Sequence, residues 1–327
     1  MKIVVIGLGS MGKRRIRLLK SLYPEREIIG VDTSEERQNQ AKQEYNIAVC
    51  SSIDNLSASD IKYAFVCTSP LSHANIINSC LKNKWHVFTE INLVNDRYEE
   101  NIELAENNNL KLFISSTPMY RKEIKFIKDK VSSVNEKISY MYHVGQYLPD
   151  WHPWESYNNF FINNKKTNGC RELFAIELPW IFDVFGEAVD FKVIKNKITK
   201  LNIDYNDIYF VLFKHKTGHT GVITVDVVSR KAVRNLEIFG ENIHIFWEGT
   251  PDTLYDLDIN NKQKKNINLY QKVEHDSKYA DNIIEDAYKK EIINFFNVIE
   301  NNTKPYHNFS KDIDILKIIN KIEGIER

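Results

Sequence analysis

Glycine and net charge are both scarce in this sequence. It contains 12 glycines, whereas average usage of about 7% would give roughly 23 in a chain of this length. The 44 Lys and Arg residues balance 44 Asp and Glu residues, which removes any general attraction to nucleic acid or to an anionic membrane surface. We therefore expect neither a nucleic-acid partner nor a membrane partner.

Cysteine and long apolar runs are scarce too. The four cysteines are scattered along the chain without a C-x-x-C pair or a recognisable zinc spacing, so we expect no disulfide framework and no metal. No 18 apolar residues follow one another, and the first apolar run, Ile3 to Ile6, is too short for a signal peptide. These absences predict a cytoplasmic protein.

What the chain does have is enough apolar material for a large core. It is 327 residues long and 43% hydrophobic, which excludes disordered, collagen-like and low-complexity classes and suggests two domains. Short β-rich runs alternate with helical periodicity over residues 1–118, which is typical of β-α-β units and predicts an α/β domain with a doubly wound parallel sheet. We expect its strands at 3–6, 27–31, 48–50, 63–68, 86–90 and 111–116. Ser72 and Asp96 are the expected N-caps of two of its helices.

Residues 119–327 follow a different pattern. Long alternating stretches predict a second domain with an antiparallel sheet. The stretches are 136–147, 191–200, 207–215, 219–228, 232–239, 243–248 and 253–258. The polar segment 259–282 lacks periodicity and predicts a loop or mobile flap. Because strand 219–228 has apolar residues on both faces, we expect this sheet to self-associate.

The sharpest local signal follows the first strand. Its residues are Gly7, Leu8, Gly9, Ser10, Met11 and Gly12. In this G-x-G-x-x-G fingerprint the glycines allow a tight turn, close approach of a pyrophosphate and close helix packing. Asp32 lies twenty residues after Gly12, where a carboxylate would accept the ribose hydroxyls and repel a 2′-phosphate. We therefore predict that residues 1–118 form a dinucleotide-binding Rossmann domain that binds NAD, with NADP less favoured. The alternative is that the glycines only shape a tight turn.

Two further segments resemble a known family. Cys67-Thr68-Ser69-Pro70 ends the fourth strand, His73 follows, and His86-Val87-Phe88-Thr89-Glu90 forms the fifth. Together with the glycine fingerprint and the domain order, they resemble the Gfo/Idh/MocA oxidoreductases over the whole chain. The resemblance implies NAD(P)-dependent chemistry on sugars, cyclitols or sugar nucleotides. It implies that residues 119–327 form an α+β domain with an open antiparallel sheet that binds substrate, and that a homodimer or homotetramer forms through this sheet. It also implies that Thr68, Ser69, Pro70 and His73 lie along the nicotinamide side and that Glu90 is the glutamate of the family's E-K-P motif.

The chain departs from that family at its catalytic residues. Ile91 stands where the family has the catalytic lysine, and Asn92 replaces the proline. Loss of one acid/base group typically removes about 10²–10⁴ in rate unless another residue substitutes. The family's second motif, with an Asp and a His on a helix, is also altered. Arg171, Glu172 and Glu177 are the candidates to replace these groups, with a structural salt bridge as the alternative role for Arg171.

A third cluster, residues 145–157, leaves the first strand of the second domain. It is rich in aromatic, acidic and proline residues, a composition that suits a sugar site. Trp151, Trp154 and Tyr157 are the predicted substrate residues, and His152 is the predicted general base. Alternatively, the two tryptophans only fix a loop to the core.

The sequence therefore predicts an NAD(P)-dependent dehydrogenase or reductase that acts on CH–OH groups of a sugar-like small molecule. The alternative hypothesis is a dinucleotide-binding sensor or assembly protein on the same fold that has lost catalysis. Ile91 is the residue that motivates this alternative.

Overall fold

A computed structural model describes residues 1–56, 60–151, 156–274 and 282–325. It divides into two compact units, described separately below. Unit 1 comprises Met1–Ser116 and Tyr288–Leu316, and unit 2 comprises Thr117–Ala287 and Lys317–Arg327. The assignment of 1–118 and 119–327 as domains stays a prediction, to which the structure adds that Tyr288–Leu316 groups with unit 1.

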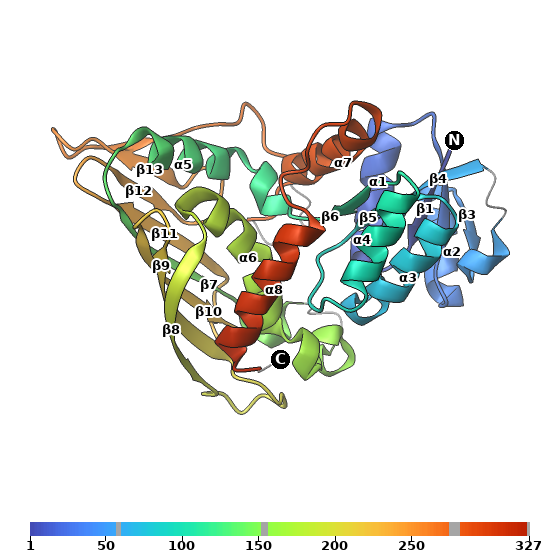
Figure 1. The fold of residues 1–327 in the computed structure, drawn as a ribbon, viewed down its shortest axis with the longest axis horizontal. Coiled ribbons are helices and arrows are strands. Elements are labelled where there is room, and N and C mark those ends of the chain that lie inside the picture. Colours follow the sequence, from blue (N-terminus) through green and yellow to red (C-terminus); the bar gives the residue numbers. More distant parts are fainter. Residues whose placement is uncertain (57–59, 152–155, 275–281, 326–327) are drawn as a thin grey trace. The chain divides into compact units, whose positions relative to one another are not determined.

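Unit 1 is built on a six-stranded parallel sheet (Figure 1). The strands are β1 (Lys2–Ile6), β2 (Glu27–Val31), β3 (Ala48–Cys50), β4 (Ile61–Val66), β5 (His86–Thr89) and β6 (Leu112–Ile114). Their order in the sheet is β3-β2-β1-β4-β5-β6, with every neighbouring pair parallel. This is the strand order of dinucleotide-binding Rossmann domains, so the predicted fold is confirmed.

Unit 1 also contains helices. They are α1 (Ser10–Leu22), α2 (Glu35–Tyr45), α3 (Pro70–Lys82), α4 (Tyr98–Asn107), most of α7 (Glu285–Glu300) and the first half of α8 (Phe309–Glu323). Phe295 of α7 contacts the rings of Phe65, Phe88 and Phe113 at centroid distances of 5.3–5.7 Å. These stacked aromatic rings from three adjacent strands explain why α7 belongs to unit 1.

Two predicted helix starts are wrong. Helix α3 begins at Pro70 with Ser69 as its cap residue, so Ser72 lies inside the helix. Proline suits the first helical position because it has no N–H to satisfy there and its φ is already helical. Helix α4 begins at Tyr98 after Arg97, which has a φ of 55° and no capping side-chain hydrogen bond, so Asp96 is not its cap.

Unit 2 contains an eight-stranded, mostly antiparallel sheet. Its strands are β7 (Ser139–Gly145), β8 (Ala188–Asn196), β9 (Ile208–His215), β10 (Thr220–Asp226), β11 (Val233–Phe239), β12 (His244–Trp247), β13 (Leu254–Leu257) and β14 (Lys264–Asn266). Their order is β14-β13-β12-β11-β7-β10-β9-β8, and the pair β7·β10 is parallel. Strand β14 corrects the prediction that 259–282 is all loop, because three polar residues at a sheet edge show no hydrophobic alternation.

The two faces of this sheet differ. Helices α5 (Lys122–Ser133) and α6 (Gly169–Phe185) lie on one face (Figure 1). The opposite face exposes large apolar side chains, among them Met141 (50% exposed), Ile194 (72%) and Leu212 (51%). Among the described residues, no helix is long and apolar enough to cross a membrane.

Candidate cofactor and catalytic sites

The glycine turn between β1 and α1 has the geometry that a dinucleotide requires. Gly7 has a φ of +92°, and a Cβ there would lie 2.6 Å from the carbonyl oxygen of Cys67. A Cβ on Gly12 would lie 1.8 Å from the carbonyl oxygen of Gly7. Gly9 is different, because a Cβ there would meet nothing within 4 Å. Gly7 and Gly12 are therefore needed by the fold itself, whereas Gly9 borders open space.

That open space lies at the positive end of a helix dipole. Gly9 caps α1 without a side-chain hydrogen bond, Ser10 and Met11 begin the first turn, and no acidic residue occurs there. Helix N-termini of this kind bind phosphate through backbone N–H groups. The residues present therefore fit the pyrophosphate of NAD or NADP.

Asp32 follows β2 and is buried beside the glycine turn. Its Oδ2 accepts a hydrogen bond from Leu8 N at 2.8 Å, and its Oδ1 accepts one from Ser34 N at 2.9 Å. Each carboxylate oxygen can accept a second bond, so ribose hydroxyls can still be bound. The half-exposed guanidinium of Arg37 lies 3.9 Å from Oδ2 and would favour a 2′-phosphate. Asp32 therefore favours NAD, whereas Arg37 favours NADP.

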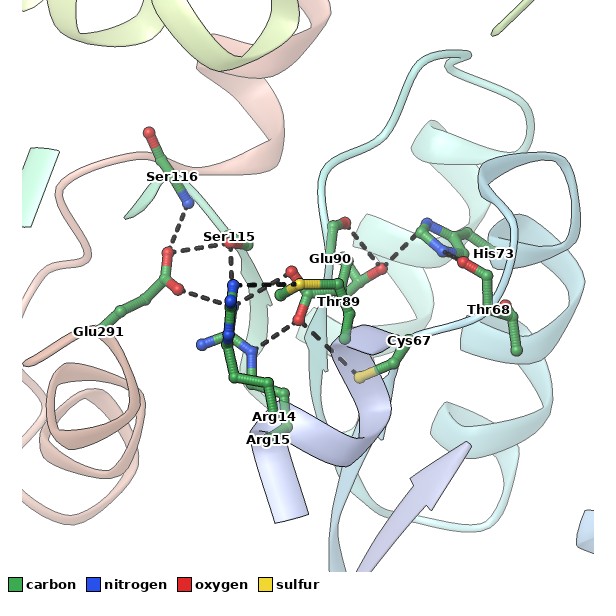
Figure 2. A network of polar contacts seen from close by, with 11 residues as sticks. Arg14, Arg15, Cys67, Thr68, His73, Thr89, Glu90, Ser115, Ser116 and Glu291 are labelled. Atoms are coloured by element: carbon green, nitrogen blue, oxygen red, sulfur yellow. Dashed lines mark hydrogen bonds and ion pairs between the residues drawn. The ribbon is translucent and has the colours of Figure 1, made fainter. Parts of the chain in front are cut away.

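A buried ion-pair network lies at the carboxyl ends of β5 and β6, with Arg15 at its centre (Figure 2). Arg15 is 0% exposed. Its Nε donates to Glu90 Oε1 at 2.6 Å, and its Nη2 donates to Glu291 Oε2 at 2.8 Å and to Ser115 Oγ at 3.3 Å. Burial alone would lower the pKa of Arg15, but the two carboxylates raise it, so the guanidinium stays charged.

Both acidic residues of this network contact other buried groups of unit 1. Glu291 Oε1 accepts hydrogen bonds from Ser115 Oγ at 3.0 Å and Ser116 N at 2.6 Å. Burial raises the pKa of Glu291, while Arg15 opposes that change. The Cys67 thiol points at Glu90 Oε1 at 3.8 Å (Figure 2), and its burial raises its pKa well above the usual value. Glu90 therefore holds secondary-structure elements together, which is a structural role.

His73 is also buried inside unit 1. Its Nε2 lies 2.9 Å from the carbonyl oxygen of Thr68, and its Nδ1 lies 2.7 Å from Asn92 Oδ1. Burial lowers the pKa of His73. His73 thus ties the Thr68–Pro70 turn, where Ser69 is exposed, to Asn92 just beyond β5. Asn92 therefore helps to keep that turn in place, and Ile91 supplies no proton-transfer group.

The predicted substrate segment lies in unit 2, directly after β7. Trp151 Nε1 donates to the carbonyl oxygen of Gln146 at 2.9 Å, and Tyr157 accepts a hydrogen bond from Asn202 N at 3.2 Å. His152 and Trp154 lie outside the described residues. Their predicted roles, like those of Trp151 and Tyr157, stay predictions.

Two of the three candidate residues on α6 already have partners. Arg171 is buried, forms an ion pair with Glu323 and donates to Asn320 Oδ1 at 2.7 Å. Glu177 is buried, pairs with Arg234, and accepts from Tyr142 at 2.8 Å and from Trp180 at 2.6 Å. This geometry favours the structural alternative for Arg171 and gives Glu177 a similar role.

Glu172 differs from both neighbours. Its Oε2 atom is buried and has no hydrogen-bond partner among the described residues. Desolvation raises its pKa to about 7. A carboxyl group that titrates near neutral pH can both take and return a proton, which is what a general acid/base requires.

No sequence motif marks Glu291. It pairs with Arg15 across 276 positions, so only the fold reveals this contact. No group of three His, Cys, Asp or Glu residues within the described ranges could hold a metal ion.

Comparison with known proteins agrees with this geometry. Residues 1–115 match the Gfo/Idh/MocA model, an oxidoreductase family with an NAD-binding Rossmann fold. The resemblance seen in the sequence is thereby confirmed for the first domain. No curated protein sequence matches the chain.

Solved structures with this fold extend over the whole chain. UDP-N-acetylglucosamine 3-dehydrogenase from Acidithiobacillus ferrooxidans is 15% identical, with a TM-score of 0.77 and coverage of 99% of this chain and 97% of that one. An Agrobacterium radiobacter oxidoreductase in complex with NAD+, L-tartaric acid and magnesium is 12% identical, with a TM-score of 0.81 and coverage of 100% and 97%. Biliverdin reductase from Synechocystis sp. PCC 6803, in complex with biliverdin and NADP+, is 12% identical, with a TM-score of 0.74 and coverage of 99% and 98%.

Proposed function

We propose that this chain, whose first 115 residues belong to the NAD-binding Rossmann domains of the Gfo/Idh/MocA oxidoreductases, is a dehydrogenase or reductase of sugar-like substrates. The substrate class is a sugar, cyclitol or sugar nucleotide with a reacting CH–OH group. The observation that carries the proposal is the glycine turn, where Gly9 borders open space at the start of α1. The name of the Acidithiobacillus relative supports a sugar nucleotide.

Each unit has its own part in this proposal. Residues Gly7 to Gly12 and Asp32 hold the dinucleotide, and Thr68, Ser69 and Pro70 lie along its nicotinamide. The cofactor, when bound, supplies the hydride acceptor for oxidation or the hydride donor for reduction. Glu172 takes the proton of the substrate hydroxyl in oxidation and returns it in reduction. We keep His152 as a second candidate for that proton transfer.

NAD is the proposed cofactor, and Asp32 is the residue that favours it. A carboxylate in this position binds the 2′-hydroxyl and repels a 2′-phosphate. Arg37 beside Asp32 supports NADP as the alternative. The dissociation constants of NAD and of NADP are measured for wild type and for Arg37→Ala, and their ratio decides between the two cofactors. A chain that uses NAD keeps its preference for NAD in the variant.

Gly9→Ala tests cofactor binding. Because a Cβ at Gly9 meets no protein atom, the variant should fold with an unchanged melting temperature. The methyl group would nevertheless occupy the space reserved for the pyrophosphate, so we expect NADH to bind at least about tenfold more weakly, a loss of roughly 1.4 kcal/mol. Fluorescence titration measures this. A wild-type chain that binds neither NADH nor NADPH at millimolar concentration would refute the proposal.

Turnover tests the alternative, a non-catalytic dinucleotide-binding protein. Ile91 favours it, because the family's catalytic lysine is missing there. Purified chain is mixed with NAD+ or NADH and a panel of sugars, cyclitols and sugar nucleotides, and nicotinamide absorbance is followed. Turnover that disappears in Glu172→Gln supports the enzyme. Tight NADH binding without turnover over the whole panel supports the sensor or assembly protein.

We also propose that the chain forms a homodimer or homotetramer in the cytoplasm. The exposed apolar face of the unit 2 sheet supports self-association, since patches of this kind usually mark interfaces. The four cysteines, none in a disulfide, suit a reducing compartment. Sedimentation of wild type and of Leu212→Lys tests the interface: the lysine variant should dissociate into folded monomers, and a monomeric wild type would contradict the proposal.

A further inference from the structure

Residues 227–232 connect β10 to β11 in unit 2. Asp226, the last residue of β10, pairs with Gly145 of β7 on one side, and Val233, the first residue of β11, pairs with Gly145 on the other. Gly145 ends β7, so this turn passes the point where the predicted substrate segment, residues 145–157, leaves the sheet. The strand order alone therefore makes the turn and the start of the substrate segment neighbours.

The turn and the substrate segment also contact each other directly. Tyr147 N donates a hydrogen bond to the carbonyl oxygen of Ser229 at 2.6 Å, and Leu148 N donates one to that of Val227 at 3.0 Å. The guanidinium of Arg230 lies over the ring of Tyr147, 4.0 Å from its centroid. The turn therefore places the side chain of Arg230 on the substrate segment.

A buried carboxylate holds this turn in shape. Asp226 Oδ1 accepts hydrogen bonds from Val228 N at 2.8 Å and from Ser229 N at 2.7 Å. Its Oδ2 accepts one from Ser229 Oγ at 2.9 Å and lies 2.6 Å from Nε2 of His143. A Cβ on Gly145 would overlap this carboxylate, so the glycine leaves the room that Asp226 needs. Burial alone would raise the pKa of Asp226, but these hydrogen bonds lower it, so the carboxylate stays ionised.

Two adjacent cations of the turn have no acidic partner. Arg230 and Lys231 are both exposed, and neither forms an ion pair within the described part of the chain. Asp226 does not neutralise them, because each of its oxygens already has two partners. Arg234 of β11 differs, because it pairs with the buried Glu177. In a chain whose 44 basic residues balance 44 acidic ones, this pair is a local excess of positive charge.

The contact with Tyr147 determines what Arg230 can bind. The contact uses no N–H group, and Arg230 donates no hydrogen bond within the described residues, so its side-chain donors remain available. These donors match two oxygens of a phosphate or a carboxylate. The ring also restricts the side chain before a ligand arrives, which lowers the entropy lost on binding. Lys231 adds a second positive charge, from which a neutral sugar would gain little.

We propose that Arg230 and Lys231 bind an anionic group of the substrate, so that this chain acts on an anionic sugar derivative rather than on a neutral sugar or cyclitol. The group is an oxygen anion, either the diphosphate of a sugar nucleotide or the carboxylate of a sugar acid. Arg230 binds two of its oxygens, and Lys231 contributes charge. This inference rests on the proposed function, because it assigns the anion to the substrate of that reaction.

The test is a calorimetric titration of the full chain, with and without NADH, and it needs no turnover. The anionic probes are UDP-N-acetylglucosamine and glucuronate, and the neutral probes are N-acetylglucosamine and myo-inositol. Wild type should bind at least one anionic probe more tightly than both neutral probes. In Arg230→Met that binding should weaken about tenfold to hundredfold, because charge-assisted hydrogen bonds are lost. Arg230 is exposed, so the variant should fold, and a melting curve checks this.

Lys216→Met is the matched control. Lys216 is exposed in the turn between β9 and β10, at the opposite end of β10 from residues 227–232. Its replacement removes one positive charge as Arg230→Met does, but the affinity for every probe should equal the wild-type value. Lys231→Met should weaken binding of the same probe as Arg230→Met, by a smaller factor.

The two anionic probes distinguish the two sources of the anion. A loss limited to UDP-N-acetylglucosamine identifies a diphosphate, a loss limited to glucuronate identifies a carboxylate, and a loss for both supports a site that accepts either. The proposal is overturned if Arg230→Met leaves the affinity for both anionic probes unchanged or if Lys216→Met weakens them equally. It is also overturned if neither anionic probe binds wild type at millimolar concentration.

Failure of this inference differs from failure of the proposed function. A chain that binds an anionic probe through Arg230 but turns over no member of the panel would end the dehydrogenase proposal and keep the anion site. Turnover of a neutral sugar that is unchanged in Arg230→Met would keep the dehydrogenase and end this inference.

Discussion

Unit 1 and unit 2 each contain a glutamate whose pKa is raised by desolvation, but the two side chains have opposite surroundings. Glu291 in unit 1 contacts Arg15, Ser115 and Ser116. Glu172 in unit 2 has no partner at Oε2 among the described residues. A carboxyl group with a full set of partners joins elements of the fold. A carboxylate without them is free to exchange its proton, so missing partners are a better sign of chemistry than burial.

The same contrast occurs between two adjacent residues of α6. Arg171 forms a buried ion pair with Glu323, whereas Glu172 does not share it. Residue type and the family resemblance made both of them candidates for the missing acid/base groups. The partners of the two residues distinguish their roles. A side chain whose polar atoms already form an ion pair is not available to bind a substrate, whereas one with an unpartnered atom is.

Of the variants that test this comparison, Arg15→Met should lower the free energy of unfolding the most. It leaves Glu90 and Glu291 buried without their cation, which typically costs about 3–5 kcal/mol of unfolding free energy. Urea denaturation at neutral pH measures the loss. Arg97→Met is the control, because Arg97 forms an exposed pair with Glu100 and its removal should change little. Similar losses in both variants would contradict a structural role for the Arg15 network.

Arg171→Met should cause the next largest loss of unfolding free energy. Its removal leaves Glu323 buried without a cation, so we expect a loss of roughly 3 kcal/mol in unfolding free energy and unchanged NADH binding. The same denaturation series and a fluorescence titration measure the two quantities. Unchanged stability together with lost turnover would instead make Arg171 a catalytic residue.

Glu172→Gln should have the smallest effect on stability, and one that depends on pH. Since burial raises the pKa of Glu172 to about 7, the folded wild type is stabilised by the protonated form at low pH. This stabilisation is fully present below the pKa of a glutamate in the unfolded chain, about 4.3. It is lost as the pH rises through the pKa of Glu172 in the folded chain, about 7. Relative to glutamine, wild type should lose on the order of 2 kcal/mol between acid and neutral pH. A pH-independent difference would contradict an unpaired carboxyl.

Features encoded by neighbouring residues were predictable from the sequence. The Rossmann strands and the glycine turn depend on local alternation and on three glycines, and the structure confirms them. The direction of β7 relative to β10 was not predictable, because alternation is the same in parallel and antiparallel strands. Strand β14 was missed since its residues are all polar.

The candidate site was less predictable because its decisive contacts join distant residues. Residue types and the family resemblance selected Arg171, Glu172 and Glu177 together. Only contacts with residues such as Glu323 and Arg234 show which of the three already has a partner.

The membership of Tyr288–Leu316 in unit 1 has a consequence for biosynthesis. Residues 1–116 leave the ribosome before Glu291 has been translated, although Glu291 is a partner of the fully buried Arg15. At about 5–20 residues per second, the remaining stretch takes on the order of ten seconds or more. During that interval the nascent nucleotide domain holds an arginine with one of its two carboxylates missing. A gene fragment that stops after β6 would make this temporary state permanent.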